Sequence, residues 1–249
     1  MKNILFTLAL LISFSSFGQP DLLNIKKNLT PAEEYFYSGR DKAYAKDYNG
    51  AIADYTKAIE LDPNNAYVYF YRGLSKDNLK DHSGAIADYT KAIELAPNDP
   101  AAYFNRGLLK DDLEDYNGAI ADYTKAIELD PNDADAYNNI GILKYNLEDY
   151  NGAISDFTKA IELDPNDALA YRNIANSYYQ INDFTKAKTA SSKAIELEPN
   201  NSEGYFLRAW HNYKLNETSK ACIDIKKAIG LGYDRKSLAE LIGLTNCTP

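Results

Sequence analysis

Apolar residues recur along the chain at the three- and four-residue spacing of amphipathic helices, in paired segments separated by short polar turns. In one pair the two segments are Ala66 to Leu79 and Ser83 to Leu95, with polar residues at 80–82 between them. Pro97 follows the second segment, and proline cannot continue a helix. The pattern predicts two helices joined by a tight turn and closed by a break.

The helix pair repeats every 34 residues. The segment Asp47 to Asn64 recurs letter for letter at Asp115 to Asn132, and near-copies begin at Asp81 and Asp149. A helical hairpin this short cannot bury its own apolar face and must stack on its neighbours. We expect six stacked units, with boundaries at 32–65, 66–99, 100–133, 134–167, 168–201 and 202–235.

Small and bulky residues keep fixed places in each unit. Glycine stands midway along the first helix of four units (Gly39, Gly73, Gly107, Gly141), and Ala175 and Ala209 replace it in the last two. A mid-helix glycine costs on the order of 1 kcal/mol relative to alanine, so we expect a close helix approach in return. The expected contact is an alanine column of the second helix: Ala51, Ala85, Ala119, Ala153, Ala187 and Ala221. Aromatic residues such as Tyr35 and Tyr55 fill the seams.

The two ends of the array carry their own signals. Thr30, Pro31 and Glu33 form an N-cap, a first-turn proline and a capping box, which predicts that the array starts there after a short tether at 19–31. Lys236 to Leu244 reads as one further amphipathic helix within 236–249, with Leu238, Leu241 and Ile242 facing inward. We expect this helix to cap the last unit.

At the 34-residue period the chain resembles the tetratricopeptide repeat family, whose signature is a succession of bulky, small, small, aromatic, small and proline residues. The resemblance covers Ala32 to Arg235, with departures at Ser191 and Ile225, which replace an aromatic residue, and at Tyr233, which replaces proline. It implies an all-α fold: a right-handed superhelical solenoid of antiparallel helix pairs with a C-terminal capping helix.

The first residues have the features of a secretory signal peptide. Lys2 is followed by the apolar stretch Ile4 to Phe14 and by Ser16-Phe-Gly18, a small-x-small cleavage site. The stretch is short for a bilayer span, and no cysteine for a lipid anchor lies nearby. We expect cleavage after residue 18 and a periplasmic or secreted protein without stable membrane insertion. The alternative is an uncleaved, amphipathic or buried N-terminal segment.

Charge and cysteine content narrow the partners and the compartment. The net charge of −9, which becomes −10 when a segment carrying Lys2 is removed, disfavours nucleic acid and anionic membrane surfaces. The two cysteines, Cys222 and Cys247, would meet an oxidising compartment after export. We expect a disulfide that pins the tail, with two buried free thiols as the alternative.

No residue pattern in the sequence indicates a catalytic site, a metal site or a phosphate-binding loop. His82 replaces a tyrosine of the inter-helix turn, His211 has no second ligand at metal-binding spacing, and the acidic pair Asp111-Asp112 is typical of a solvated helix end. No phosphate loop or nucleophile motif occurs. We therefore expect neither an enzyme nor a cofactor or metal site.

Charged columns run along both helices. Aspartates of the second helix precede lysines by three positions, as Asp88 precedes Lys91, and our first interpretation is exposed pairing within that helix. Alternatively, the first-helix arginines Arg72, Arg106 and Arg208 reach the aspartate column, or they face a ligand.

The second helices are near copies, whereas the first helices differ between units. In the resembled family the first helices line the concave groove that holds a peptide or partner helix, which places the variable residues on the ligand face. The resemblance implies these groove residues: Phe70, Tyr71, Phe104, Asn105, Asn138, Asn139, Arg172, Asn173 and Asn176. An amide ladder could bond an extended main chain between aromatic walls, or the asparagines are merely solvated. Arg172 with Asn176 resembles half of a carboxylate clamp, left incomplete by Leu207.

Three functions follow in decreasing order of support. The first is a non-catalytic scaffold that binds a protein or peptide partner in its groove. The second is a structural element of a cell-envelope complex whose units self-associate, if only weakly, through the convex face or an uncapped end. The third is an accessory to an enzyme with a small-molecule ligand.

Overall fold

A computed structural model describes residues 29–248, and these residues form thirteen helices and no strand. The helices are α2 (Pro31–Tyr44), α3 (Tyr48–Leu61), α4 (Ala66–Asn78), α5 (His82–Leu95), α6 (Pro100–Asp112), α7 (Tyr116–Leu129), α8 (Ala134–Asn146), α9 (Tyr150–Leu163), α10 (Ala168–Gln180), α11 (Phe184–Leu197), α12 (Ser202–Lys214), α13 (Thr218–Gly230) and α14 (Ala239–Thr245). The signal peptide expected at 1–18 and most of the expected tether lie outside the described residues.

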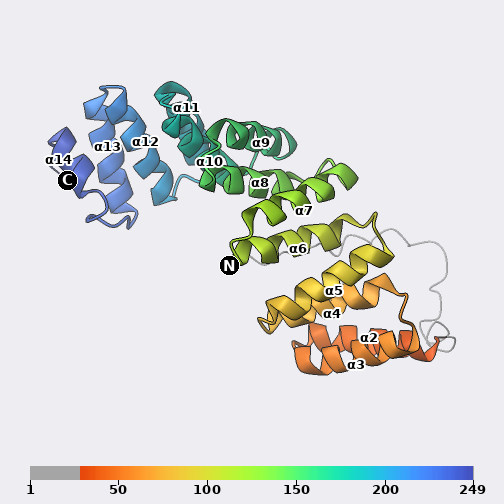
Figure 1. Ribbon diagram of the computed structural model, residues 1–249. Helices are drawn as coiled ribbons and strands as arrows, with labels where there is room; N and C mark the ends of the chain where they lie inside the picture. The colour runs from red at the N-terminus through yellow and green to blue at the C-terminus, as the bar shows by residue number, and fades with distance from the viewer. Residues whose placement is uncertain (1–28, 249) are drawn as a thin grey trace, which may run out of the picture.

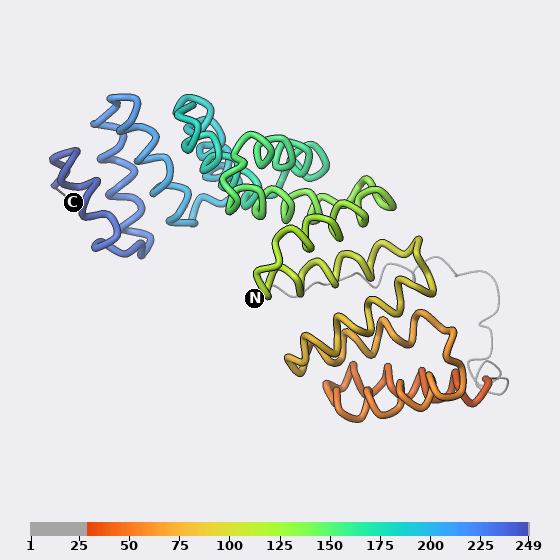
Figure 2. The backbone as a smooth tube through the Cα atoms, in the orientation of Figure 1, coloured from red at the N-terminus to blue at the C-terminus, as the bar shows by residue number. Residues whose placement is uncertain are grey.

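The helices form antiparallel pairs that stack one after another (Figure 1). The pairs are α2 with α3, α4 with α5, and so on to α12 with α13, and each pair also packs on the next. The backbone traces an elongated, curved stack with α2 at one end and α14 at the other (Figure 2). This confirms the all-α solenoid of helix pairs expected from the pattern. No helix within residues 29–248 is long and apolar enough to cross a membrane.

Local signals set the helix ends. The capping box at the start of α2 is present, with the Thr30 hydroxyl accepting from the Glu33 N–H and the Glu33 carboxylate accepting from the Thr30 N–H. Within the first unit, Asp47 caps α3 by accepting from the N–H of Gly50. The turn between the helices passes through Lys46 at φ 62°, a left-handed conformation that equivalent residues repeat in every unit. Such a residue ends one helix sharply and lets the next begin almost at once.

The aromatic rings of the second helix lie closest to the glycine column, and the expected alanine contact is present beside them at Gly39, where a Cβ would lie 3.2 Å from the Ala51 carbonyl oxygen. A Cβ on Gly107 would lie 2.9 Å from Cε1 of Tyr123, and one on Gly141 would lie 2.6 Å from Cε1 of Phe157. In the fifth unit Ala175 replaces the glycine and Ser191 replaces the aromatic residue sixteen positions later. The two columns therefore change together, because the ring occupies the space that a methyl group would need.

The charged columns meet across the helix pair, which corrects the expectation of exposed pairs within one helix. Asp88 is 3% exposed, and its carboxylate accepts hydrogen bonds from Nε and Nη2 of Arg72 at 2.9 and 2.7 Å. The ammonium of Lys76 lies 2.7 Å from the same carboxylate. Arg106 pairs with Asp122 and Arg208 with Asp224 in the same way. The Arg72 guanidinium also donates to the Thr56 hydroxyl of the preceding unit, so each such arginine fastens two units.

The capping helix is present but is shorter than expected. It runs over Ala239–Thr245, because Asp234 accepts hydrogen bonds from the N–H and hydroxyl of Ser237 and holds that stretch in a turn. Leu238 and Leu241 are fully buried against the last unit, as expected, while Ile242 is only half-buried. In the structure the sulfurs of Cys222 and Cys247 are bonded, which ties α13 to the tail after α14.

Candidate partner-binding groove

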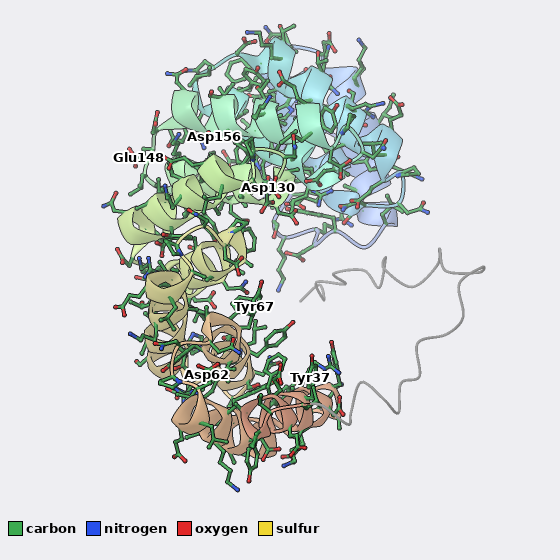
Figure 3. All side chains as sticks on the ribbon, turned by 90° about the vertical axis from the view of Figure 1, so that its right-hand side faces the viewer. Tyr37, Asp62, Tyr67, Asp130, Glu148 and Asp156 are labelled. Atoms are coloured by element: carbon green, nitrogen blue, oxygen red, sulfur yellow. A yellow bond between two sulfur atoms is a disulfide. The ribbon has the colours of Figure 1, made fainter. Side chains whose placement is uncertain are left out.

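First-helix residues of the first two units lie on the inner side of the curve. Figure 3 shows Tyr37 of α2 and Tyr67 of α4 on that side, whereas Glu148 lies on the outer side. Tyr37 is 37% exposed and Tyr67 is 64% exposed. In the fifth unit, Asn173 of α10 stands at the repeat position of Tyr37, and Leu169 stands at that of Tyr67. By the regularity of the repeat, we expect these two positions to line the inner surface along the array.

The expected aromatic wall of the groove is also part of the core. The rings of Phe70 and Phe104 lie 5.7 Å from Tyr89 and 5.4 Å from Tyr123 of their own second helices. Tyr71 makes an edge contact with Phe70, at 5.6 Å between ring centres. All three expected wall residues are half-buried, so part of each ring packs in the core and part is accessible to solvent.

The expected asparagine ladder is not uniform. The Asn105 amide donates to the Ala101 carbonyl of its own helix at 2.8 Å. The Asn173 amide donates to Asn138 Oδ1 at 3.2 Å, which joins α10 to the buried Asn138 of α8. Asn139 lies beside the Tyr123 hydroxyl without making a hydrogen bond of good geometry. The asparagines thus have different neighbours, and each keeps some unused hydrogen-bonding groups.

Arg172 does not stand free to clamp a carboxylate. It is only 9% exposed, and its Nη1 donates to Glu198 at 2.6 Å while its Nε lies 3.2 Å from Glu203 of the next unit. Both partners are distant in sequence, which is why the pattern of the first helix did not reveal them. Asn176, its expected companion, instead lines a hollow between two first helices.

This hollow lies between α8 and α10 and has a volume of about 230 Å³. It is lined by Ile142, Tyr145, Asn146, Phe157, Leu169, Asn173 and Asn176. Two of the expected groove residues, Asn173 and Asn176, are therefore brought together with apolar side chains. No charged side chain lines the hollow. Such a lining suits an apolar side chain and the polar main chain beside it.

One unit earlier, the equivalent columns carry acids, which we call the acidic cluster: Asp111, Asp112 and the hydroxyl of Tyr123. Burial, and next the charge of Asp112, raise the pKa of the Asp111 carboxyl. Tyr123 is fully buried, its hydroxyl has no hydrogen-bond partner, and both aspartates act on it electrostatically. Sequence reasoning missed this cluster because Tyr123 read as packing and the aspartates as a solvated helix end. The change from Tyr123 to Phe157 in the next unit was the available signal.

The two histidines show no catalytic arrangement. His211 is 1% exposed, lies 3.1 Å from the Ser191 hydroxyl through Nδ1, and burial lowers its pKa to about 4. His82 is the first residue of α5. Within residues 29–248 no group of three or more histidine, cysteine, aspartate or glutamate side chains could hold a metal ion.

Comparison with known families decides the identity of the repeat. A model described as TPR repeat matches residues 32–76, 79–110 and 112–148, and two models described as Tetratricopeptide repeat match residues 134–167 and 157–189. The chain belongs to the tetratricopeptide repeat family. Proteins of this family are typically scaffolds for protein interaction and not enzymes, and they generally bind protein or peptide partners.

Solved tetratricopeptide repeat structures share the fold. MamA is 26% identical with a TM-score of 0.65, over 70% of this chain and 94% of MamA. YrrB, described as a TPR protein with an unusual peptide-binding site, is 22% identical with a TM-score of 0.68, over 75% of this chain and 96% of YrrB. The C-terminal part of a TPR repeat-containing protein from Cytophaga hutchinsonii is 24% identical with a TM-score of 0.72, over 84% of each chain. No curated protein matches the sequence.

Proposed function

We propose that this tetratricopeptide repeat protein is a non-catalytic scaffold that holds an extended segment of a partner protein along the inner surface of its first helices. One observation carries the proposal: the hollow between α8 and α10, where variable first-helix residues combine apolar walls with the amides of Asn173 and Asn176. An extended segment presents alternating side chains and free main-chain groups, which such a surface can bind.

The chemistry of the two ends supports a scaffold over a self-assembling element. In α4 to α12 the third and tenth residues of each unit are buried between units, as Val68 and Ser75 are. The first unit carries Glu34 and Asp41 in these columns. Stacking another copy on α2 would bury two carboxylates, which is costly without partners. At the other end α14 already covers the last unit.

We further propose that the protein acts outside the cytoplasm. Residues 1–18 have the sequence of a cleavable signal peptide, and a Cys222–Cys247 disulfide is compatible with an oxidising compartment. Mass spectrometry of unreduced protein from the native envelope fraction tests both points. A chain that retains residues 1–18, or peptides of the two cysteines that are never cross-linked, would contradict this location.

Capture of partners from the envelope fraction tests the groove. Leu169 lines the hollow and is 44% exposed, so we expect a charged side chain there to leave the core packing intact. We expect Leu169→Arg, or alanine at Asn139 and Asn173 together, to weaken capture of the partner that wild type retains. Leu61→Arg is the matched control, because Leu61 is 54% exposed at the end of a second helix. Equal capture by Leu169→Arg and wild type would remove the groove from the mechanism.

A further inference from the structure

The inner surface changes character between one unit boundary and the next. Around the α8–α10 hollow stand Tyr145, Asn146, Phe157 and Leu169. The residues 34 positions earlier are Asp111, Asp112, Tyr123 and Asp135. Three acids and a hydroxyl thus precede a neutral, mostly apolar lining. A peptide that follows the inner surface meets the acidic cluster at one unit and the apolar hollow at the next.

The acidic cluster is placed where negative charge is unfavourable in the protein alone. Asp111 and Asp112 are the last two residues of α6, and the C-terminal end of a helix carries partial negative charge. Neither carboxylate makes an ion pair with a residue of the described chain, whereas the neighbouring Lys110 is committed to Asp122. The two carboxylates are therefore available to pair with a cation from outside the chain.

The buried tyrosine hydroxyl is a second and independent feature of the same place. Tyr123 is fully buried, yet its hydroxyl oxygen has no partner. A buried hydroxyl without a hydrogen bond costs free energy. The fourth unit shows that the fold does not require the group, since Phe157 occupies the equivalent position with the same burial. The Asn139 amide lies beside this oxygen without a well-formed hydrogen bond, so a cation from outside the chain would pair with the adjacent carboxylates and would reach this oxygen only when the side chains that cover it move aside.

We infer that the partner segment is basic: an arginine or lysine side chain binds at Asp111, Asp112 and the Tyr123 hydroxyl, while an apolar side chain of the same segment fills the α8–α10 hollow. Both cations carry only N–H donors, which match the carboxylate oxygens and the acceptor lone pairs of the hydroxyl oxygen. This inference rests on the proposed function and specifies its ligand. Neighbouring packed helices are about 8–10 Å apart and an extended chain advances about 3.3 Å per residue, which separates the two side chains by roughly two to three residues.

The net charge of the whole chain favours the same partner. At −9 the protein attracts a cationic segment over distances longer than the contact itself and accelerates its association. Because this attraction is screened by salt, affinity for the basic segment falls as ionic strength rises. An apolar segment without charge would show no such dependence.

Selection from a displayed library of random peptides, each about twelve residues long to span the two places, tests the inference on the full chain. We expect enriched peptides to carry arginine or lysine roughly two to three residues from a large apolar residue. One enriched peptide, followed by fluorescence anisotropy, should bind about tenfold more weakly to Asp111→Asn/Asp112→Asn than to wild type.

Glu60→Gln/Glu148→Gln is the matched control, because it removes two exposed charges away from the cluster. We expect it to change affinity by less than about twofold. Peptides that bind in the groove, lose binding with Leu169→Arg and yet lack a basic residue would overturn the inference and leave the proposed function standing. Unchanged affinity of Asp111→Asn/Asp112→Asn would do the same. A library that yields no binding peptide would contradict the proposed function and this inference together.

Discussion

The third and fifth units have the same backbone plan but join their two helices in opposite ways. In the third, Arg106, Lys110 and Asp122 form a nearly buried ionic group, with Asp122 4% exposed. In the fifth, Ile174 and Ala190 occupy the first and third of these columns and lie together in an apolar cluster. One fold therefore accepts either a polar or an apolar seam, so the ion pairs are not what defines the helix hairpin.

The fourth unit lies between these two solutions. Ile140 replaces the arginine, but Asp156 remains and is held only by Lys144 at 2.7 Å. Burial raises the pKa of the Asp156 carboxyl, and the nearby lysine offsets this only in part. The comparison shows that, within the ionic group, the arginine is the residue that stabilises the ionised form of the buried aspartate. The arginine also fastens adjacent units, a tie that is missing where the fourth unit meets the third and the fifth, because Ile140 and Ile174 replace the arginine there.

The largest expected effect comes from breaking the ionic group of the third unit. Asp122→Ala leaves Arg106 and Lys110 without their shared partner, and we expect a loss of about 3–5 kcal/mol in unfolding free energy. The triple variant Arg106→Ile/Lys110→Tyr/Asp122→Ala copies the fifth unit and should recover most of that loss. Urea denaturation followed by circular dichroism measures both. A triple variant as unstable as Asp122→Ala would show that the apolar seam depends on its own neighbours.

How far the sequence could reveal the structure is seen in the same residues. The period, the caps and the proline breaks are local or exactly repeated signals, so the helix pairs and their stacking follow from them. The partner of Asp122 is not local: Arg106 lies sixteen residues earlier on another helix, and spacing along α7 pointed to Lys125 instead. Lys125 in fact pairs with Glu128.

The candidate groove was foreseeable as a surface but not in its details. Variation among the first helices pointed to the inner side, and Asn173 and Asn176 do line a hollow there. The ion pairs of Arg172 with Glu198 and Glu203 could not be predicted from the sequence pattern, because both acids lie outside the helix that carries Arg172. The orientation of the Tyr123 hydroxyl depends on packing that no linear pattern records.

The second-largest expected effect is a pH dependence of stability at the boundary of the fifth and sixth units, where His211 is buried beside Ser191. Burial lowers the folded-state pKa of His211 to about 4, against an unfolded value of 6.5, so the unfolded state takes up the proton first as pH falls. Stability is therefore full above about pH 6.5 and is lost between 6.5 and 4, by about 2–3 kcal/mol at pH 4.5.

Hydrogen exchange at pH 7 and pH 4.5 checks this expectation, with rates corrected for intrinsic chemistry. Protection should fall more in α11 and α12 than in α5 and α6, where Leu109 is the equivalent interface residue. His211→Leu supplies the control, since it should remove the extra pH dependence of α11 and α12. An equal loss of protection in both regions would assign the effect to the carboxylates at large.

A smaller effect is expected from the glycine column. Gly107→Ala places a methyl group against the ring of Tyr123, and we expect a net loss of about 1 kcal/mol because overpacking outweighs the gain in helix propensity. Gly107→Ala/Tyr123→Ser copies Ala175 and Ser191 of the fifth unit and relieves the clash at the cost of lost ring burial. Comparing thermal melts of Gly107→Ala with those of Gly204→Ala separates the effects, because the three atoms nearest to a Cβ on Gly204 all belong to Ile195, the first at 3.0 Å, and none to an aromatic ring. Equal melting shifts would deny a special role to the ring.

The smallest expected change in stability is the most informative for function. Tyr123→Phe removes a buried hydroxyl that has no partner and copies Phe157, so thermal stability should stay unchanged or rise slightly. Phe157→Tyr makes the reverse change and adds a hydroxyl beside the apolar hollow. With a basic peptide selected on wild type, we expect Tyr123→Phe to weaken binding about threefold, the loss of one modest hydrogen bond. Phe157→Tyr should weaken binding of the peptide's apolar side chain instead. If Tyr123→Phe melts lower than wild type, the hydroxyl serves folding, and the contrast between the two units is structural in origin.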